Sequence, residues 1–265
     1  MDTNRSFRLG YSDATWGDMP GLEEAMSAIA AAGWEGVEIR NASIDWLGTP
    51  RRLRNLIDKH DLIPVSMFGS LSLGGDSSQV LEAQRRRLEY AAEVGCQAFC
   101  VTGAQRVLYR SATDDEFKRL AEMAEALVVH AAPSGITVAY LRDGGYGHRS
   151  TIESEQDEDQ LLGYAPRIGL CLDVAVAALK GDDPVVQLRK YRNRLAGVRL
   201  RDWGRGKFCL LGKGTLGLDY ARIRETLNDI DYDGWVSCEL PANADMEGSE
   251  SCHLNREYLR SVGYR

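Results

Sequence analysis

Short apolar runs alternate with longer amphipathic segments from one end of the chain to the other. Eight runs have the composition of strands, and they cover residues 7–12, 35–40, 63–68, 98–103, 136–141, 168–173, 197–202 and 235–240. The intervening segments carry apolar residues at helical spacing, as in 22–33, 80–95 and 116–132, and several end at a glycine, a common helix stop. Eight such units in 265 residues predict a closed (β/α)8 TIM barrel of the α/β class, as one domain over residues 1–265.

Composition narrows the classes of function. The 32 basic and 39 acidic residues give a net charge of -7, which disfavours nucleic acid as a partner. No segment has the roughly 20 apolar residues of a membrane helix, and the N-terminus lacks the apolar run of a signal peptide, so a cytoplasmic protein without a membrane partner is expected. The six cysteines have no paired metal spacing, and we interpret them as reduced, buried thiols. The sequence does not decide whether the protein forms a homo-oligomer.

Active sites of TIM barrels lie at the carboxyl ends of the strands, so the side chains that point inward there are the candidates. In the run 197–202, Val198 and Leu200 share one face, which suits contact with the helices. Alternation along a strand then directs Arg199 and Arg201 into the barrel. The residues expected to surround one point at this end are Leu141, Asp173, Arg199 and Glu239.

Several stretches carry a family resemblance that extends over essentially the whole chain. They read GWEGVEIR at 33–40, LDVAVAALKGDDP at 172–184, YRNRLAGVRLRDW at 191–203, LLGKGTLGLDY at 210–220 and GWVSCEL at 234–240. In these stretches the chain resembles the xylose isomerase-like TIM barrel family of sugar phosphate isomerases and epimerases, which includes inosose dehydratases and, more distantly, AP endonucleases. The resemblance implies four strand-end ligands, commonly glutamate or histidine, aspartate, histidine and glutamate, around a divalent metal such as Mn, Mg or Zn.

The implied metal site is incomplete in this chain. Asp173 and Glu239 match the second and fourth ligands, whereas Leu141 and Arg199 stand at the other two positions. Leucine has no donor atom, and arginine stays protonated, so neither can ligate a metal. No cofactor is therefore expected, and any metal would rest on Asp173 and Glu239 alone. We hypothesise that the Arg199 guanidinium stands where the metal stood and balances the two carboxylates.

The family resemblance implies a sugar isomerase- or epimerase-like enzyme, of isomerase or lyase type, that transfers a proton next to a carbonyl, in an isomerisation or elimination of a small sugar-like or anionic polyol substrate. Glu239 is expected to be the base, while Asp173 positions a hydroxyl or holds Arg199, which stabilises the developing enolate. His148, in the loop after the fifth strand, is a further candidate acid or base.

Five more residues are candidates for binding the substrate, and each has a purely structural alternative. Arg142, Arg201 and Arg205 suit an anionic group, Trp16 suits a sugar ring, and Lys213 hints at an anionic ligand. Salt bridges, packing or surface charge would explain them equally well, as a helix cap would explain Asp173. Glu38 is a second-tier candidate. The alternative function is a catalytically degenerate barrel that binds a small molecule or a partner subunit.

Overall fold

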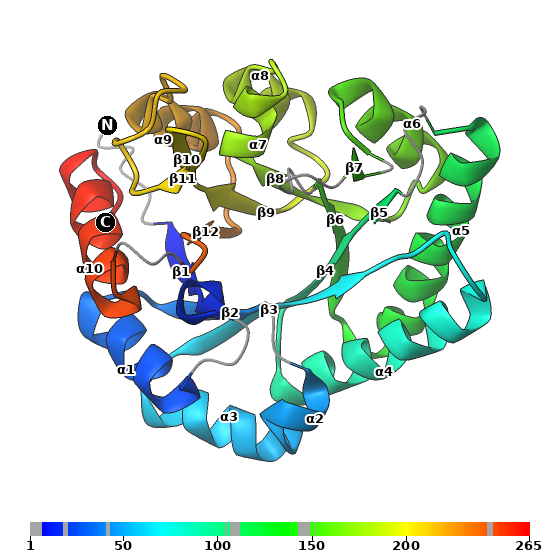
Figure 1. The fold of residues 1–265 in the computed structure, drawn as a ribbon, viewed down its shortest axis with the longest axis horizontal. Coiled ribbons are helices and arrows are strands. Elements are labelled where there is room, and N and C mark those ends of the chain that lie inside the picture. The colour runs from blue at the N-terminus through cyan, green and yellow to red at the C-terminus, as the bar shows by residue number, and fades with distance from the viewer. Residues whose placement is uncertain are drawn as a thin grey trace.

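The structure is a computed structural model, and it describes residues 7–17, 21–40, 43–103, 105–106, 112–142, 149–150, 152–242 and 246–265. Eight parallel strands close into a barrel in the order β1-β12-β9-β8-β6-β4-β3-β2. Figure 1 looks along the barrel and shows the strands at the centre with the helices around them. The predicted TIM barrel is confirmed.

Each of the eight predicted strands is present. The barrel strands are β1 (Arg8–Ser12), β2 (Gly36–Ile39), β3 (Ile63–Ser70), β4 (Ala98–Thr102), β6 (Thr137–Leu141), β8 (Gly169–Asp173), β9 (Leu195–Leu200) and β12 (Trp235–Cys238). The predicted run 197–202 differs most, because β9 ends at Leu200 and the chain then enters a separate antiparallel hairpin. That hairpin pairs β10 (Asp202–Gly204) with β11 (Lys207–Cys209), and a second small pair joins β5 (Gln105–Arg106) to β7 (Arg149–Ser150).

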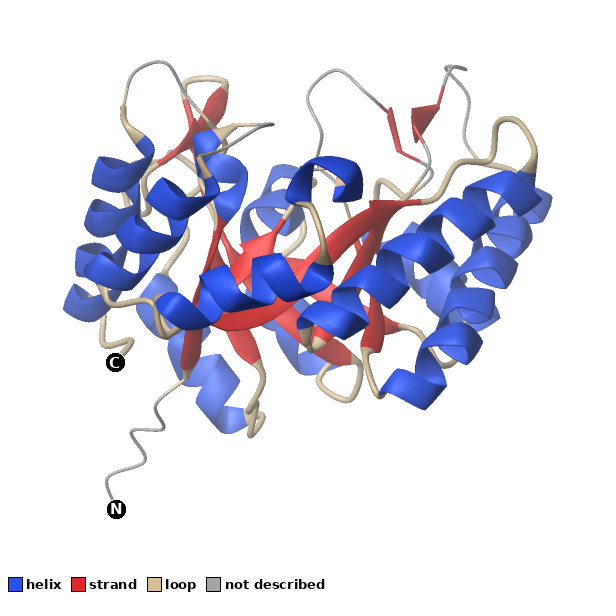
Figure 2. Cartoon of the chain, turned by 90° about the horizontal axis from the view of Figure 1, so that it is seen from below, coloured by secondary structure: helices blue, strands red, loops and turns tan. Residues whose placement is uncertain are grey.

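Helices fill the segments between the strands and form the outer layer (Figure 2). They are α1 (Leu22–Ala32), α2 (Ile44–Leu47), α3 (Pro50–Lys59), α4 (Ser77–Val94), α5 (Asp114–Ala131), α6 (Glu155–Tyr164), α7 (Val174–Leu179), α8 (Pro184–Lys190), α9 (Tyr220–Asp229) and α10 (Gly248–Ser261), with the 3-10 turns η1 (Asp13–Trp16) and η2 (Ala132–Ser134).

Local sequence signals set the helix ends. Thr113 and Glu116 form a reciprocal capping box at the start of α5, which satisfies amide groups that have no partner within the helix. Gly33 and Gly95 end α1 and α4 with φ values of 84° and 89°, a left-handed conformation in which a side chain would be strained. The predicted glycine stops are confirmed at both positions.

Strand alternation separates two apolar layers. Val138, Leu170 and Val198 belong to the large cluster between the strands and the helices. A smaller cluster inside the barrel consists of Phe68, Ala98, Cys100, Ala139, Leu141 and Cys171. The inner cluster contains few large side chains, so polar groups at the strand ends have room to meet. The six cysteines are free. Across the part of the chain that is described, no helix is both long and apolar enough to cross a membrane.

Candidate active site at the carboxyl ends of the strands

Three charged side chains meet where β8, β9 and β12 end. Asp173 is the last residue of β8, while Arg201 and Glu239 directly follow β9 and β12. Arg201 donates from Nε to Asp173 Oδ2 at 2.6 Å and from Nη1 to Glu239 Oε1 at 2.9 Å. All three side chains are buried. One guanidinium therefore bridges two carboxylates that adjacent parts of the barrel bring to the same end.

Arg199 lies deeper in the barrel and is fully buried. Its Nη2 donates to Glu38 Oε2 at 2.8 Å, and its Nη1 lies 3.3 Å from Glu239 Oε2. The expectation that Asp173 holds Arg199 is therefore corrected, since the guanidinium between Asp173 and Glu239 belongs to Arg201. The reason is that the Asp173 carboxylate turns toward α7, where its Oδ1 accepts the amide N–H groups of residues 175 and 176 at 3.0 Å each.

Two further charged residues, Asp13 and Arg40, directly follow β1 and β2 and lie beside these side chains. Arg40 donates from Nη1 to Glu239 Oε2 at 3.0 Å, and its backbone N–H donates to Asp13 Oδ1 at 2.8 Å. Asp13 is 1% exposed, and its Oδ2 has no hydrogen-bond partner among the described residues. We use "charge cluster" below for the following side chains: Asp13, Glu38, Arg40, Asp173, Arg199, Arg201 and Glu239.

The arginines keep the central carboxylate ionised. Burial alone would raise the pKa of Glu239, but the guanidinium groups of Arg199, Arg40 and Arg201 outweigh it and hold that pKa at about 2. For Arg199, burial lowers the pKa, while Glu239 and Glu38 raise it well above its ordinary value. With such a low pKa, Glu239 is a weak base as long as all three guanidinium groups face it.

Asp13 behaves in the opposite way. Burial raises the pKa of Asp13 to about 7, the Arg40 amide opposes the rise, and the negative charges of Glu239 and Glu38 add to it. A carboxyl group with a pKa near neutrality can both take up and release a proton at cellular pH, as a general acid or base must. Asp13 is therefore the member of the charge cluster best matched to proton exchange.

Apolar side chains cover part of the charge cluster. Phe208 on β11 lies over Arg201, with the guanidinium carbon 3.9 Å from the ring centroid. Phe208 packs in turn with Val176 and Leu240. Phe68, near the end of β3, lies against Arg199, whose guanidinium carbon is 4.6 Å from the centroid of the ring. Such rings exclude water, which strengthens each interaction between the charges beneath them.

The donor set at these positions does not suit a divalent metal. Leu141 fills the fifth-strand position within the inner apolar cluster, and Arg199 fills the seventh-strand position. The oxygens of Asp173 and Glu239 already accept hydrogen bonds from guanidinium and amide donors. Within the described ranges, no three histidine, cysteine or acidic side chains gather closely enough to hold a metal.

Arg142 is not part of the charge cluster, which corrects its assignment to the substrate site. It follows the inward-facing Leu141, so alternation along the strand turns it outward. Its Nη1 donates to Asp182 Oδ2 at 2.8 Å, its Nε lies 3.5 Å from Glu158 Oε1, and Nη2 donates to Gln187 at 3.5 Å. Arg142 therefore joins β6 to the helix layer.

The remaining candidates are spread over other positions. Arg205 is exposed in the two-residue turn of the β10–β11 hairpin, with φ of 54°, and Lys213 is exposed in the loop that follows. Trp16 is half-buried and packs edge-on against Tyr11 with ring centroids 6.2 Å apart, which favours its packing alternative. His148 lies outside the described residues.

Comparisons with known proteins agree with this architecture. The family model described as xylose isomerase-like TIM barrel matches residues 26–261. An inosose dehydratase of Lacticaseibacillus casei is 24% identical, over 91% of this chain and 92% of its own length. The solved structure of an L-ribulose 3-epimerase superposes with a TM-score of 0.82 at 16% identity, covering 97% of this chain and 94% of that one. The IOLI protein with a bound zinc atom gives a TM-score of 0.81 at 16% identity, covering 97% and 98%.

Proposed function

The chain belongs to the xylose isomerase-like TIM barrel family, and from that premise we propose that it is an enzyme of isomerase or lyase type acting on a small sugar-like or anionic polyol substrate. One observation carries the proposal, namely that Arg201 bridges Asp173 and Glu239 at the carboxyl ends of the strands. TIM barrel enzymes place their catalytic groups at this end. The proposed reaction is proton transfer next to a carbonyl, without a divalent metal.

Arg40 and Arg201 are the proposed anion-binding groups. The Arg40 side chain is 15% exposed, against 3% for Arg201 and 0% for Arg199, so it is the most accessible of the three guanidinium groups. A guanidinium binds a carboxylate or phosphate through two parallel hydrogen bonds. It can equally stabilise the oxygen of an enolate. Charge and geometry thus favour a substrate with an anionic group or a carbonyl that becomes one.

Substrate binding would also activate Glu239. An anion that takes over hydrogen bonds of Arg40 or Arg201 removes part of the positive charge that lowers the pKa of Glu239, and burial then raises that pKa. Glu239 can accept the proton from the carbon next to the carbonyl, and the electron pair of the C–H bond moves to the carbonyl oxygen. The enolate that forms is stabilised by the two arginines.

The fate of the enolate decides the reaction type. Return of a proton to a neighbouring atom gives isomerisation. Expulsion of the hydroxyl on the next carbon gives elimination, in which Asp13 donates the proton and the hydroxyl leaves as water. Glu239 then returns its proton to Asp13 through solvent, which restores both groups. Elimination matches the activity named for the inosose dehydratase relative and makes inosose the first substrate to test.

Deuterium exchange tests for the proposed proton transfer whichever product is formed. The protein is incubated in D2O with inosose, other small ketoses and their phosphorylated or carboxylated forms, and mass spectrometry follows deuterium next to the carbonyl and loss of water. We expect exchange catalysed by the wild type and reduced at least about 100-fold in Glu239→Gln, the scale of a lost acid–base group. Glu257→Gln, on the exposed face of α10, is the matched control.

Asp13→Asn separates the two proton-transfer roles. It should leave exchange measurable, because Glu239 still abstracts the proton, while slowing water loss and removing the limb of the pH profile near pH 7. Exchange in Glu239→Gln within a few-fold of wild type would contradict the role of Glu239. No exchange with any substrate would contradict enzymatic activity on this class of molecule.

A binding protein without turnover is the second candidate, favoured by one specific observation. Glu38, Asp173 and Glu239 each already contact a guanidinium group and are 2–4% exposed. Carboxylates that stay paired would fix a ligand without moving protons. Thermal stabilisation by sugar acids or phosphate, in the absence of any deuterium exchange, would identify this alternative.

A further inference from the structure

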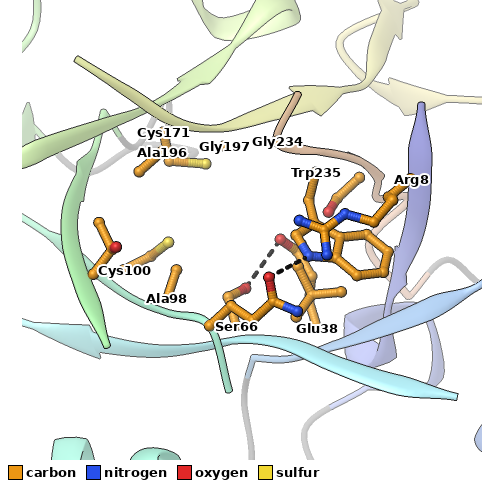
Figure 3. Close-up of a pocket in the computed structure, with 14 residues that line it drawn as sticks. Arg8, Glu38, Ser66, Ala98, Cys100, Cys171, Ala196, Gly197, Gly234 and Trp235 are labelled. Atoms are coloured by element: carbon orange, nitrogen blue, oxygen red, sulfur yellow. Dashed lines mark hydrogen bonds between the residues drawn. The ribbon is translucent and has the colours of Figure 1, made fainter. Parts of the chain in front are cut away.

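A cavity lies at the end of the barrel opposite the candidate active site, among the first residues of the strands. Its volume is about 130 Å³. Small side chains line its wall, including Ala98, Ala196 and Gly197 (Figure 3). This end of a TIM barrel is usually packed with large branched residues, so the cavity reflects the choice of small ones here. The groups assigned to the proposed reaction, Glu239, Asp13, Arg40 and Arg201, do not line it, and Glu38 is the one member of the charge cluster that does.

Polar and charged groups of two kinds line this cavity. Its rim carries Arg8, which is half-buried, and the exposed Gln97 and Thr137. The guanidinium carbon of Arg8 stacks 4.7 Å from the centroid of the Trp235 ring, and Trp235 Nε1 donates to Gln97 Oε1 at 3.1 Å. No carboxylate of a described residue pairs with Arg8. The rim therefore offers a positively charged group held in place by an aromatic ring.

The inner end of the cavity offers hydrogen-bonding groups. Ser66 donates from Oγ to Glu38 Oε1 at 3.0 Å, and both side chains line the cavity. The hydroxyl of Ser237 also lines it and is 3% exposed. The thiols of Cys100 and Cys171 complete this end, and Figure 3 shows them pointing into the space.

We propose that this cavity is a second binding site, for a small hydroxy acid whose carboxylate pairs with Arg8 and whose hydroxyl groups reach Glu38, Ser66 and Ser237. The positive rim selects a negative charge, and the Glu38 carboxylate accepts hydrogen bonds from the hydroxyl end. The volume is below the roughly 300–1,000 Å³ of pockets for drug-sized molecules, so the ligand is a small one. Because Glu38 also accepts from Arg199 at 2.8 Å, the bound molecule would contact the charge cluster through one side chain.

Calorimetry with glycerate as the probe tests the proposal, with glycerol and inorganic phosphate to separate the hydroxyl groups from the charge. We expect glycerate to bind at one site per chain and more tightly than either of the other two. Arg8→Gln should weaken binding about tenfold or more, which is the loss of about 1.4 kcal/mol. Ala98→Leu, which fills the cavity, should abolish it. Arg51→Gln, an exposed arginine on α3, is the matched control and should bind as the wild type does.

Three outcomes of calorimetry overturn the proposal. One is the absence of glycerate binding to the wild type. A second is binding that persists in Ala98→Leu but is lost in Arg201→Lys, which would place glycerate at the carboxyl ends of the strands. Tighter binding of phosphate than of glycerate would likewise contradict a hydroxy acid site, because the hydroxyl groups would then contribute nothing.

Thiol labelling locates the ligand without a substitution. Methyl methanethiosulfonate is small, and mass spectrometry of peptides resolves each cysteine. Cys100 and Cys171 should be labelled in the free protein and protected by glycerate, whereas Cys209, half-buried on β11 and away from the cavity, should react equally in both samples. Labelling of these thiols that glycerate leaves unchanged would place the ligand elsewhere.

Discussion

Asp13→Asn should change the stability of the protein in a pH-dependent way. The pKa of Asp13 is raised from 3.8 to about 7 in the folded protein. The folded state therefore holds a proton that the unfolded state has already released, and the free energy of unfolding falls as pH rises from about 4 to about 7. Above about pH 8 little further loss occurs, because the carboxyl group is then ionised in both states.

The size of this effect follows from the two pKa values. Each pH unit between them corresponds to about 1.4 kcal/mol, so the wild type should lose about 3 kcal/mol between pH 5 and pH 7 through this one group. Asparagine keeps the acceptor for the Arg40 amide but cannot ionise. Relative to the wild type, Asp13→Asn should therefore be about 3 kcal/mol more stable at pH 8 than at pH 5.

Urea unfolding at pH 5 and pH 8 measures this difference directly, since the comparison of two proteins cancels the other titrating groups. Asp233→Asn, on the exposed loop before β12, is the matched control and should shift stability by at most about 0.5 kcal/mol at either pH. If Asp13→Asn changes the free energy of unfolding equally at both pH values, burial does not raise the pKa of Asp13 in the way the structure indicates.

Three further predictions concern other charged groups. Arg201→Met leaves Asp173 and Glu239 without their shared partner, so urea unfolding should show a loss of about 3–5 kcal/mol; a loss under about 1 kcal/mol would match an ordinary surface pair and contradict the bridge. Burial raises the pKa of Glu158 to about 7, so Glu158→Gln should stabilise the protein at pH 8 more than at pH 4, and equal shifts would refute this. Leu141→Glu combined with Arg199→His should gain manganese by elemental analysis, whereas one ion per chain in the wild type would contradict the donor-set argument.

The sequence predicts the barrel well because each strand has a short, clear signal. Alternation in the run 197–202 also places Arg199 and Arg201 inside, and both are buried there. The same rule could have excluded Arg142, since it directly follows Leu141 and must face the other way. The outward direction of Arg142 could thus be predicted by extending the alternation of β6 by one residue.

Pairings within the charge cluster could not be predicted in the same way. They depend on side-chain direction, and Asp173 turns to cap α7 and so meets Arg201 rather than Arg199. Asp13 lies one residue past the first predicted strand, where strand-end position alone could have suggested it. Its raised pKa, however, follows from burial and from the nearby charges of Glu239 and Glu38, which only the folded structure brings together, and one of its oxygens has no partner among the described residues.

Leu141 and Arg199 stand at the two positions where the family resemblance implies metal ligands, and the surroundings of each resist a single substitution. Removing Arg199 alone would strip Glu38 and Glu239 of a buried partner, and placing an acid at position 141 alone would add a charge to an apolar interior. Either change alone should therefore lower the stability of the fold before any ion could compensate. A metal site at this end of the barrel would require both substitutions together.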